Sequence, residues 1–287
     1  MTSPSSMAAV ALIAHLLVLP SIGAAAEVAL ASEWINAESS RVRLLGGRVE
    51  GRGAGARLLA GLEIEMADGW KTYWRNPGSS GVPPRLDWSK SANLADARVL
   101  FPAPLRFVDR DGDTIGYKGA VVLPIELVAK DASKPVELAL AAEYGICKDI
   151  CIPVELTLSL SVPPDAAAVP GDSRLARALE RVPRPASARR AGDPAVTRVK
   201  SELTGDMPRI VIETSFPGGT QGADLFVEAP DGLWVPLPKK TGGASGNAVS
   251  FEIDLTDGVD PAELEGKTLR LTLVSDAGQA ETTFKLE

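Results

Sequence analysis

Residues 144–153 read YGICKDICIP and join two runs, 136–143 and 155–162, in which apolar and polar side chains alternate. Successive side chains of a β-strand point to opposite faces, so this alternation predicts strands with one buried face. Similar runs recur between Gly, Pro, Asp and Asn, and amphipathic helical patterns are nearly absent. The pattern predicts an all-β chain of antiparallel sandwiches rather than βαβ units.

The two cysteines of this stretch, Cys147 and Cys151, are the only ones in the chain. In an extended strand, Cα atoms four residues apart lie about 13 Å from each other, and in a helix the Cβ atoms lie about 5–6 Å apart. A disulfide needs Cβ atoms roughly 3.5–4.5 Å apart. If the pair is bonded, residues 148–150 must therefore form a turn, in a tight hairpin or a distorted strand end.

A disulfide that closes a loop of so few residues stabilises a fold only slightly. It removes only about 2 kcal/mol of unfolded-state entropy, against more than about 4 kcal/mol for a loop of roughly 100 residues. Short, constrained bridges are typical of disulfides that are made and broken. The sequence favours a redox pair over a structural disulfide, and metal binding is the weaker alternative, because two thiolates do not fill a zinc site and Met66 and Met207 are scattered.

The first 26 residues contain no Lys, Arg, Asp or Glu, and an apolar stretch at 8–19 gives way to Pro20, Gly23 and three alanines. We interpret 1–26 as a secretory signal peptide with a small-residue cleavage site. An uncleaved membrane anchor is the alternative, although the apolar stretch is shorter than the ~20 residues of a spanning helix. Export to an oxidising compartment, the periplasm, would allow a disulfide to persist.

Composition excludes several classes of function. The only histidine, His15, lies in the expected signal peptide, which argues against Ser/His or Cys/His catalysis, His-based zinc sites and haem ligation through His. The net charge is −7 and no basic block stands out, so nucleic-acid binding is not expected. We expect no bound cofactor, and electrons would have to come from another protein.

The remaining length suits two domains of about 100–150 residues. We place the first at 27–162, where 42–49, 58–66 and 120–128 alternate besides the two runs above, and where 70–86 and 101–117 are long connecting segments rich in Pro and Gly. Residues 163–194, rich in Ala, Pro and Arg, form a linker with one short helix at 173–181. Residues 195–287 form a second small β-sandwich, for which an interaction or spacer role is the simplest interpretation.

Beyond the cysteines, the chain resembles the N-terminal periplasmic domain of the thiol:disulfide interchange protein DsbD, especially the branch found in the copper-sensitivity suppressor protein ScsB. The matching pieces are DGWKTYWRNPG at 68–78, GVPP at 81–84, and segments 117–124 and 147–153. The resemblance spans about residues 40–162. It implies an immunoglobulin-like sandwich whose cysteine pair takes electrons from a thioredoxin-like protein, or a membrane electron-transfer protein, and passes them to exported disulfide-containing proteins.

By position in the resemblance, Cys151 corresponds to the cysteine that forms the mixed disulfide with the partner, and Cys147 corresponds to its resolving mate. Family members also shield the pair with an aromatic cap, whose counterpart would lie in 104–117. Phe107 or Tyr117 could supply the cover, and Trp70 and Tyr73 could flank the sulfurs. Two other functions stay open: a noncatalytic protein-binding module with a structural disulfide, and a copper-handling protein.

Overall fold

The computed structural model describes residues 30–50, 56–108, 112–171 and 173–287. The expected signal peptide at 1–26 lies outside these residues. Within the described ranges, no helix combines the length and the apolar character that crossing a bilayer requires.

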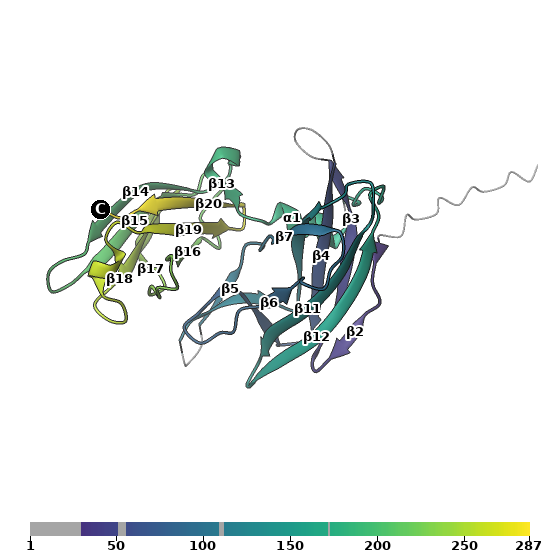
Figure 1. Ribbon diagram of the computed structural model, residues 1–287. Helices are drawn as coiled ribbons and strands as arrows, with labels where there is room; N and C mark the ends of the chain where they lie inside the picture. The colour runs from purple at the N-terminus through teal and green to yellow at the C-terminus, as the bar shows by residue number, and fades with distance from the viewer. Residues whose placement is uncertain (1–29, 51–55, 109–111, 172) are drawn as a thin grey trace, which may run out of the picture.

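The described chain folds into two β-sandwiches joined by a short, partly helical segment (Figure 1). In the first domain, one sheet has the order β1-β3-β4-β10-β7 with β2 beside β3, and the other has the order β12-β11-β5-β9-β8 with β6 beside β11. The strands of the first sheet are β1 (Leu30–Ala31), β2 (Ile35–Ala37), β3 (Ser40–Glu50), β4 (Ala56–Met66), β7 (Leu94–Val99) and β10 (Ala120–Ala129). Those of the second are β5 (Lys71–Gly78), β6 (Arg85–Asp87), β8 (Leu105–Phe107), β9 (Thr114–Lys118), β11 (Val136–Cys147) and β12 (Cys151–Val162).

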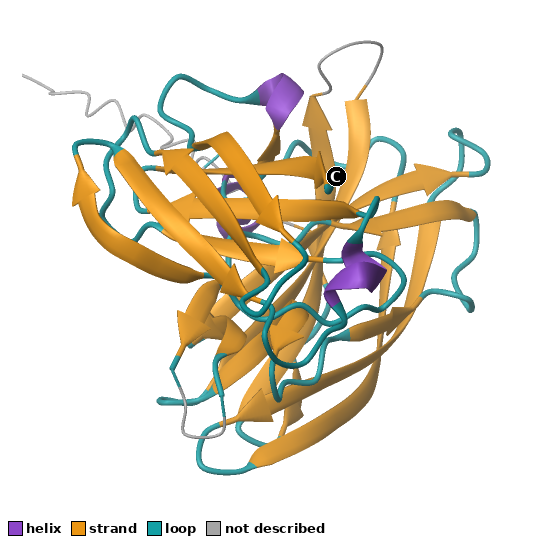
Figure 2. Ribbon diagram, turned by 90° about the vertical axis from the view of Figure 1, so that its left-hand side faces the viewer, coloured by secondary structure: helices purple, strands orange, loops and turns teal. Residues whose placement is uncertain are grey.

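The second domain has two four-stranded sheets, β13-β20-β19-β16 and β14-β15-β18-β17. Their strands are β13 (Arg184–Pro185), β14 (Ala195–Glu202), β15 (Arg209–Ser215), β16 (Asp224–Glu228), β17 (Lys239–Ser245), β18 (Ala248–Asp254), β19 (Thr268–Ser275) and β20 (Gly278–Lys285). A one-turn helix, α2 (Pro261–Leu264), precedes β19. Figure 2 shows how little helix the described chain contains, which confirms the all-β prediction.

Apolar side chains on alternate positions of the strands form the core of the first domain, between its two sheets. Residues such as Leu44 on β3, Leu62 on β4 and Leu138 on β11 are at most 2% exposed. The hairpin of β11 and β12 is paired without interruption from Val136 opposite Val162 to Cys147 opposite Cys151. The tight hairpin predicted around the cysteines is therefore confirmed.

Strands β5, β8 and β9 lie inside the two Pro- and Gly-rich segments that were expected to be connections. Asn76-Pro77-Gly78 interrupts the alternation of β5, and its ladder with β9 shifts register between Tyr73 and Gly78. At Gly116 on β9, an added Cβ would lie 1.9 Å from the Thr72 carbonyl oxygen, so the close approach of these two strands requires glycine. These strands depend on contacts with neighbours, which local alternation does not reveal.

The segment between the domains is anchored to both. Its helix α1 (Arg174–Glu180) begins at Ser173, whose hydroxyl accepts a hydrogen bond from the Ala176 N–H at 3.1 Å. Leu175 and Ala178 pack against the outer face of the first sheet, in a cluster with Leu45, Leu59 and Val122. After α1, the short strand β13 pairs in parallel with β20 of the second domain. A 3-10 turn, η1 (Ala186–Ala188), follows it.

Candidate functional site

The disulfide lies at the turn of the β11–β12 hairpin. Cys147 is the last residue of β11 and Cys151 the first of β12, and their sulfurs are bonded with the Cα atoms 4.1 Å apart. The turn between them is closed by a hydrogen bond from the Lys148 N–H to the Ile150 carbonyl at 3.1 Å. Because the two cysteines are an antiparallel pair, their side chains point to the same face of the sheet. On this hairpin it is the outer face, since Val136, Leu138 and Ile146 point into the core.

The two cysteine residues differ in exposure. Cys147 is 9% exposed, whereas Cys151 belongs to the exposed residues. The three turn residues are exposed as well, and Ile150 leaves 66% of its surface in solvent. A thiolate arriving from solvent therefore reaches the sulfur of Cys151 more easily than that of Cys147.

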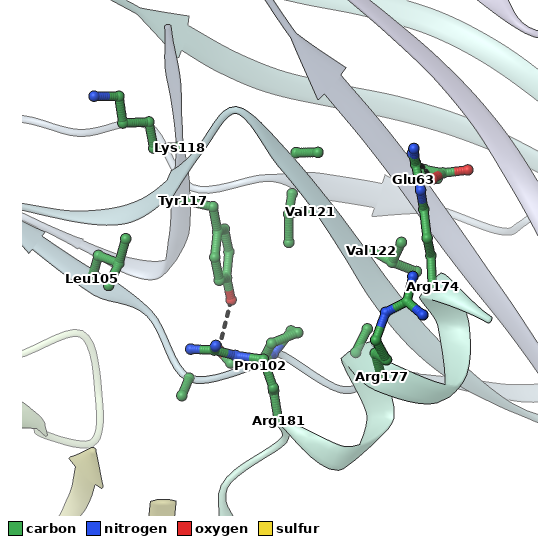
Figure 3. Close-up of a pocket in the computed structure, with 13 residues that line it drawn as sticks. Glu63, Pro102, Leu105, Tyr117, Lys118, Val121, Val122, Arg174, Arg177 and Arg181 are labelled. Carbon is green, nitrogen blue, oxygen red and sulfur yellow. Dashed lines mark hydrogen bonds and ion pairs between the residues drawn. The ribbon is translucent and has the colours of Figure 1, made fainter. Parts of the chain in front are cut away.

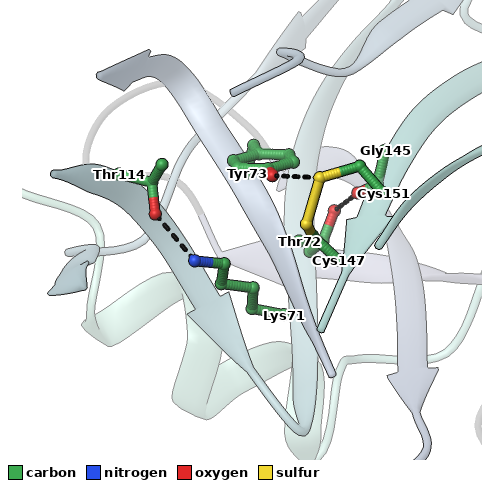
Figure 4. The surroundings of a disulfide bond; sticks show 7 residues. All are labelled: Lys71, Thr72, Tyr73, Thr114, Gly145, Cys147 and Cys151. Carbon is green, nitrogen blue, oxygen red and sulfur yellow. Dashed lines mark hydrogen bonds between the residues drawn. A yellow bond between two sulfur atoms is a disulfide. The ribbon is translucent and has the colours of Figure 1, made fainter. Parts of the chain in front are cut away.

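Tyr73 lies directly against this disulfide (Figure 4). Its hydroxyl oxygen is 3.3 Å from Cys151 Sγ, and the ring is 2% exposed. A sulfur in a disulfide carries no hydrogen, so the tyrosine hydroxyl is the donor. The ring has room because two neighbours are glycines: an added Cβ would lie 3.2 Å from the ring at Gly145 and 2.5 Å from it at Gly81.

Lys71, two residues before Tyr73 on β5, faces the same side and is paired with Cys147 on the neighbouring strand. Its ammonium group donates to Thr114 Oγ1 at 2.9 Å and lies 5.1 Å from the ring centre of Phe107 (Figure 4 shows Lys71 and Thr114). Phe107 therefore lies on the disulfide side of the sheet, separated from Cys147 by Lys71. A second cation, Lys148 in the turn, donates to the Asp68 carbonyl at 3.3 Å.

The other two aromatic residues proposed from the sequence lie elsewhere. Tyr117 is paired with Thr72 and points into the core, where its hydroxyl donates to the Pro102 carbonyl at 2.9 Å (Figure 3). Burial raises the pKa of this hydroxyl well above its usual value. Its position corrects the expectation that Tyr117 could cover the sulfurs. Trp70 is half-buried and packs against the core cluster of the first domain.

A cavity of about 470 Å³ lies beside α1 and is lined by Tyr117, Val121, Arg177 and Arg181 among others. Figure 3 shows these side chains. Neither cysteine lines the cavity. In the described part of the chain, no three His, Cys, Asp or Glu side chains come together as ligands of a metal ion would.

Sequence reasoning did not identify Lys71, Thr114, Gly145 or Val82 as neighbours of the disulfide. Val82 is 55% exposed, and its Cβ would lie 3.3 Å from a Cβ at position 145, which places it beside Tyr73 and the hairpin. These neighbours were missed because β5 was not recognised as a strand in the sequence. Once Lys71 and Tyr73 are assigned to a strand paired with β11, the two side chains fall on the face of the cysteines.

This arrangement suits disulfide exchange in three respects. One cysteine is exposed, the other is sheltered, and a hydroxyl group donates to the sulfur of the exposed one. Exchange proceeds by attack of a thiolate on a disulfide sulfur, so it depends on access and on stabilisation of the thiolate that forms.

Comparisons with known proteins agree with this geometry. The family model described as thiol:disulfide interchange protein DsbD, N-terminal, matches residues 52–163. A second model, described as a domain of unknown function, DUF8393, matches residues 181–287. Comparison with curated proteins gave no match.

Among solved structures, the fold is similar to that of the N-terminal periplasmic domain of ScsB from Proteus mirabilis, with a TM-score of 0.65 and 23% sequence identity. The similarity covers 90% of this chain and 98% of the ScsB domain, and hence extends over both sandwiches. The matched residues include the hairpin disulfide, so the first sandwich is a domain similar to the N-terminal domain of DsbD.

Proposed function

We propose that this chain is a periplasmic thiol:disulfide exchange protein that carries two electrons at a time through Cys147 and Cys151. The observation that carries the proposal is the bridge between an exposed residue, Cys151, and a sheltered one, Cys147, with the Tyr73 hydroxyl 3.3 Å from Cys151 Sγ. The match to the DsbD N-terminal model supports the class of reaction, and the likeness to a periplasmic domain, with the expected signal peptide, supports the compartment.

In the reductive half of the cycle, a thiolate of a reduced thioredoxin-like protein attacks Cys151 Sγ. The Cys147–Cys151 bond breaks, Cys147 leaves as a thiolate, and the partner is held through a mixed disulfide with Cys151. A second thiol of the partner then attacks its own bridged sulfur and releases Cys151 as a thiolate. The partner ends oxidised and the cysteine pair ends reduced.

In the oxidative half, the Cys151 thiolate attacks a disulfide of an exported substrate protein, and one substrate sulfur leaves as a thiolate. Cys147 then attacks Cys151 Sγ, which restores the internal bridge and frees the second substrate thiol. The charges that follow Cys147 in the turn oppose each other, since Lys148 would favour its thiolate and Asp149 would disfavour it. Tyr73 favours the thiolate of Cys151 by donating a hydrogen bond.

Trapping tests the roles of the two sulfurs. In a Cys147→Ser variant expressed in an exporting host, the mixed disulfide between Cys151 and a substrate protein cannot be resolved, because Cys147 is the thiol that resolves it, so we expect this species to accumulate. Non-reducing electrophoresis followed by mass spectrometry should then identify exported substrate proteins bound to Cys151. The matched control is Cys151→Ser, which leaves only the sheltered Cys147 and should capture far less. Equal capture by the two variants would contradict the assignment of roles, and capture by neither would contradict exchange itself.

A further inference from the structure

The second domain inserts an aromatic side chain into the first. Phe226 on β16 is 1% exposed and belongs to the core cluster of the first domain, where its ring centre lies 5.8 Å from that of Trp74. Val274 on β19 joins the same cluster. A side chain buried in this way fixes one domain against the other more firmly than a tether would.

Two arginines of the first domain make charged contacts across this boundary. Arg75 donates to Glu228 at 2.7 Å and to Glu281 at 2.5 Å, with its side chain 21% exposed. Burial opposes the charge of Arg75, yet the two carboxylates hold its pKa above the ordinary value. Arg106 makes a two-pronged contact with Asp224, at 2.9 and 2.8 Å. Such paired N–H donors fix orientation as well as distance.

These contacts are made by β5, which pairs with β11 beside the disulfide, and by β8, which lies two strands further along the same sheet. Trp74 and Arg75 directly follow Tyr73 on β5, and Arg106 directly precedes Phe107 on β8. Asn76, also on β5, donates to the Val227 carbonyl at 3.0 Å. Figure 1 shows β5 at the boundary between the two sandwiches.

The strand ladders of the first domain are regular on β5 only up to Tyr73. The pairing of β5 with β11 consists of Lys71 with Cys147 and Thr72 with Ile146, and the ladder with β9 is interrupted after Tyr73. Residues 74–76 lie where the ladder is interrupted, and there the second domain supplies the contacts. Tyr73 thus lies at the end of the regularly paired part of β5, next to residues that contact the second domain.

We propose that the second domain is a clamp on the redox site: by holding β5 and β8 it keeps the Tyr73 hydroxyl on Cys151 and so sets the thiol–disulfide equilibrium. This inference rests on the proposed exchange function. Phe226, Glu228 and Asp224 are its positioning residues, and none of them touches a sulfur in the described contacts. If these contacts served only to hold the domains together, they would not need to involve the strand beside the disulfide. The segment with α1 and β13 already joins the two domains.

The test uses the full chain and the equilibrium constant with glutathione as its readout. Glu228→Lys puts a cation beside Arg75, and Phe226→Ala removes the inserted ring. Both should shift the equilibrium at least threefold toward the disulfide, because a displaced Tyr73 no longer stabilises the Cys151 thiolate of the reduced form. The matched control is Glu202→Lys, which breaks an ion pair with Arg209 (2.9 Å) in the other sheet of the second domain and should leave the equilibrium unchanged.

A Tyr73→Phe background separates positioning from general loosening. If the clamp acts through the hydroxyl, adding Glu228→Lys to Tyr73→Phe should cause little further shift, because the two changes remove the same interaction. Should Phe226→Ala fail to fold, as judged by circular dichroism, Phe226→Leu replaces it.

The outcomes distinguish the two proposals. A wild-type pair that does not exchange with glutathione would overturn the proposed function, and the clamp with it. Normal wild-type exchange with unchanged equilibria in Glu228→Lys and Phe226→Leu would overturn the clamp alone, as would full additivity with Tyr73→Phe.

Discussion

Removing the Tyr73 hydroxyl should raise the pKa of the Cys151 thiol. In the oxidised protein this hydroxyl donates to a neutral sulfur at 3.3 Å, which is a weak acceptor. After reduction the same donor can reach a thiolate, and hydrogen bonds to charged groups are worth about 1.5–3 kcal/mol. Since one pKa unit corresponds to about 1.4 kcal/mol, Tyr73→Phe should raise the pKa of Cys151 by roughly one unit or more.

The measurement is a pH titration of thiolate ultraviolet absorbance in a Cys147→Ser background, where Cys151 is the only thiol. The control is Tyr144→Phe, which removes a buried hydroxyl from the opposite face of the same hairpin, where it lies 3.1 Å from the Ser40 hydroxyl. We expect Tyr144→Phe to leave the pKa of Cys151 unchanged.

The same interaction has a redox consequence with a definite sign. A donor to the thiolate stabilises the reduced form, so its loss should make the disulfide harder to reduce. A tenfold change in the exchange equilibrium corresponds to about 30 mV, so the reduction potential of Tyr73→Phe should be lower by about that amount. An unaltered pKa of Cys151 in Tyr73→Phe would refute this reasoning, because the contact would then contribute nothing to the thiolate.

Three further predictions concern stability, each measured by urea unfolding of the full chain. Gly116→Ala should destabilise the first domain by about 3 kcal/mol or more through a clash with the adjacent backbone, whereas Gly171→Ala, which meets no atom within 4 Å, should not. Leu175→Ala should cost about 2–5 kcal/mol, because its buried side chain holds α1 on the first sheet. The hydrogen bond from Arg184 lowers the pKa of Asp193. This pair should therefore stabilise the fold above about pH 4 and lose its effect as the pH falls further. Asp193→Asn should be destabilising at neutral pH and much less so near about pH 2.

The hairpin was predictable from the sequence because its information is local. Alternation across 136–162 gives both strands and their buried faces, and the reach of a disulfide limits the chain at 148–150 to a turn. The second sandwich was predictable for the same reason, since strands such as β15, β18 and β19 alternate clearly.

The surroundings of the disulfide were only partly predictable. Tyr73 and Phe107 lie on the side of the sulfurs, but Tyr117 points into the core, and the sequence could not separate them while β5, β8 and β9 were interpreted as connections. These strands are short, contain or adjoin Pro and Gly, and are completed by neighbours distant in sequence.

The contacts between the domains were beyond local analysis. Phe226 lies between Leu225 and Val227, which face the core of the second domain, so its ring points to the opposite face of β16. The run of three apolar residues does not show that the other domain covers that face. Glu228 and Arg75 are 153 positions apart, and charge pairing at that separation becomes visible only when the fold places two strands together.

The reduction potential of the Cys147–Cys151 pair in the full chain tests the central claim most directly. A pair that exchanges electrons with thioredoxin-like proteins should titrate against glutathione or dithiothreitol with a potential above about −300 mV. A value well below that limit would mean that the bridge stays closed under physiological conditions, and it would contradict the account by making the disulfide a structural one.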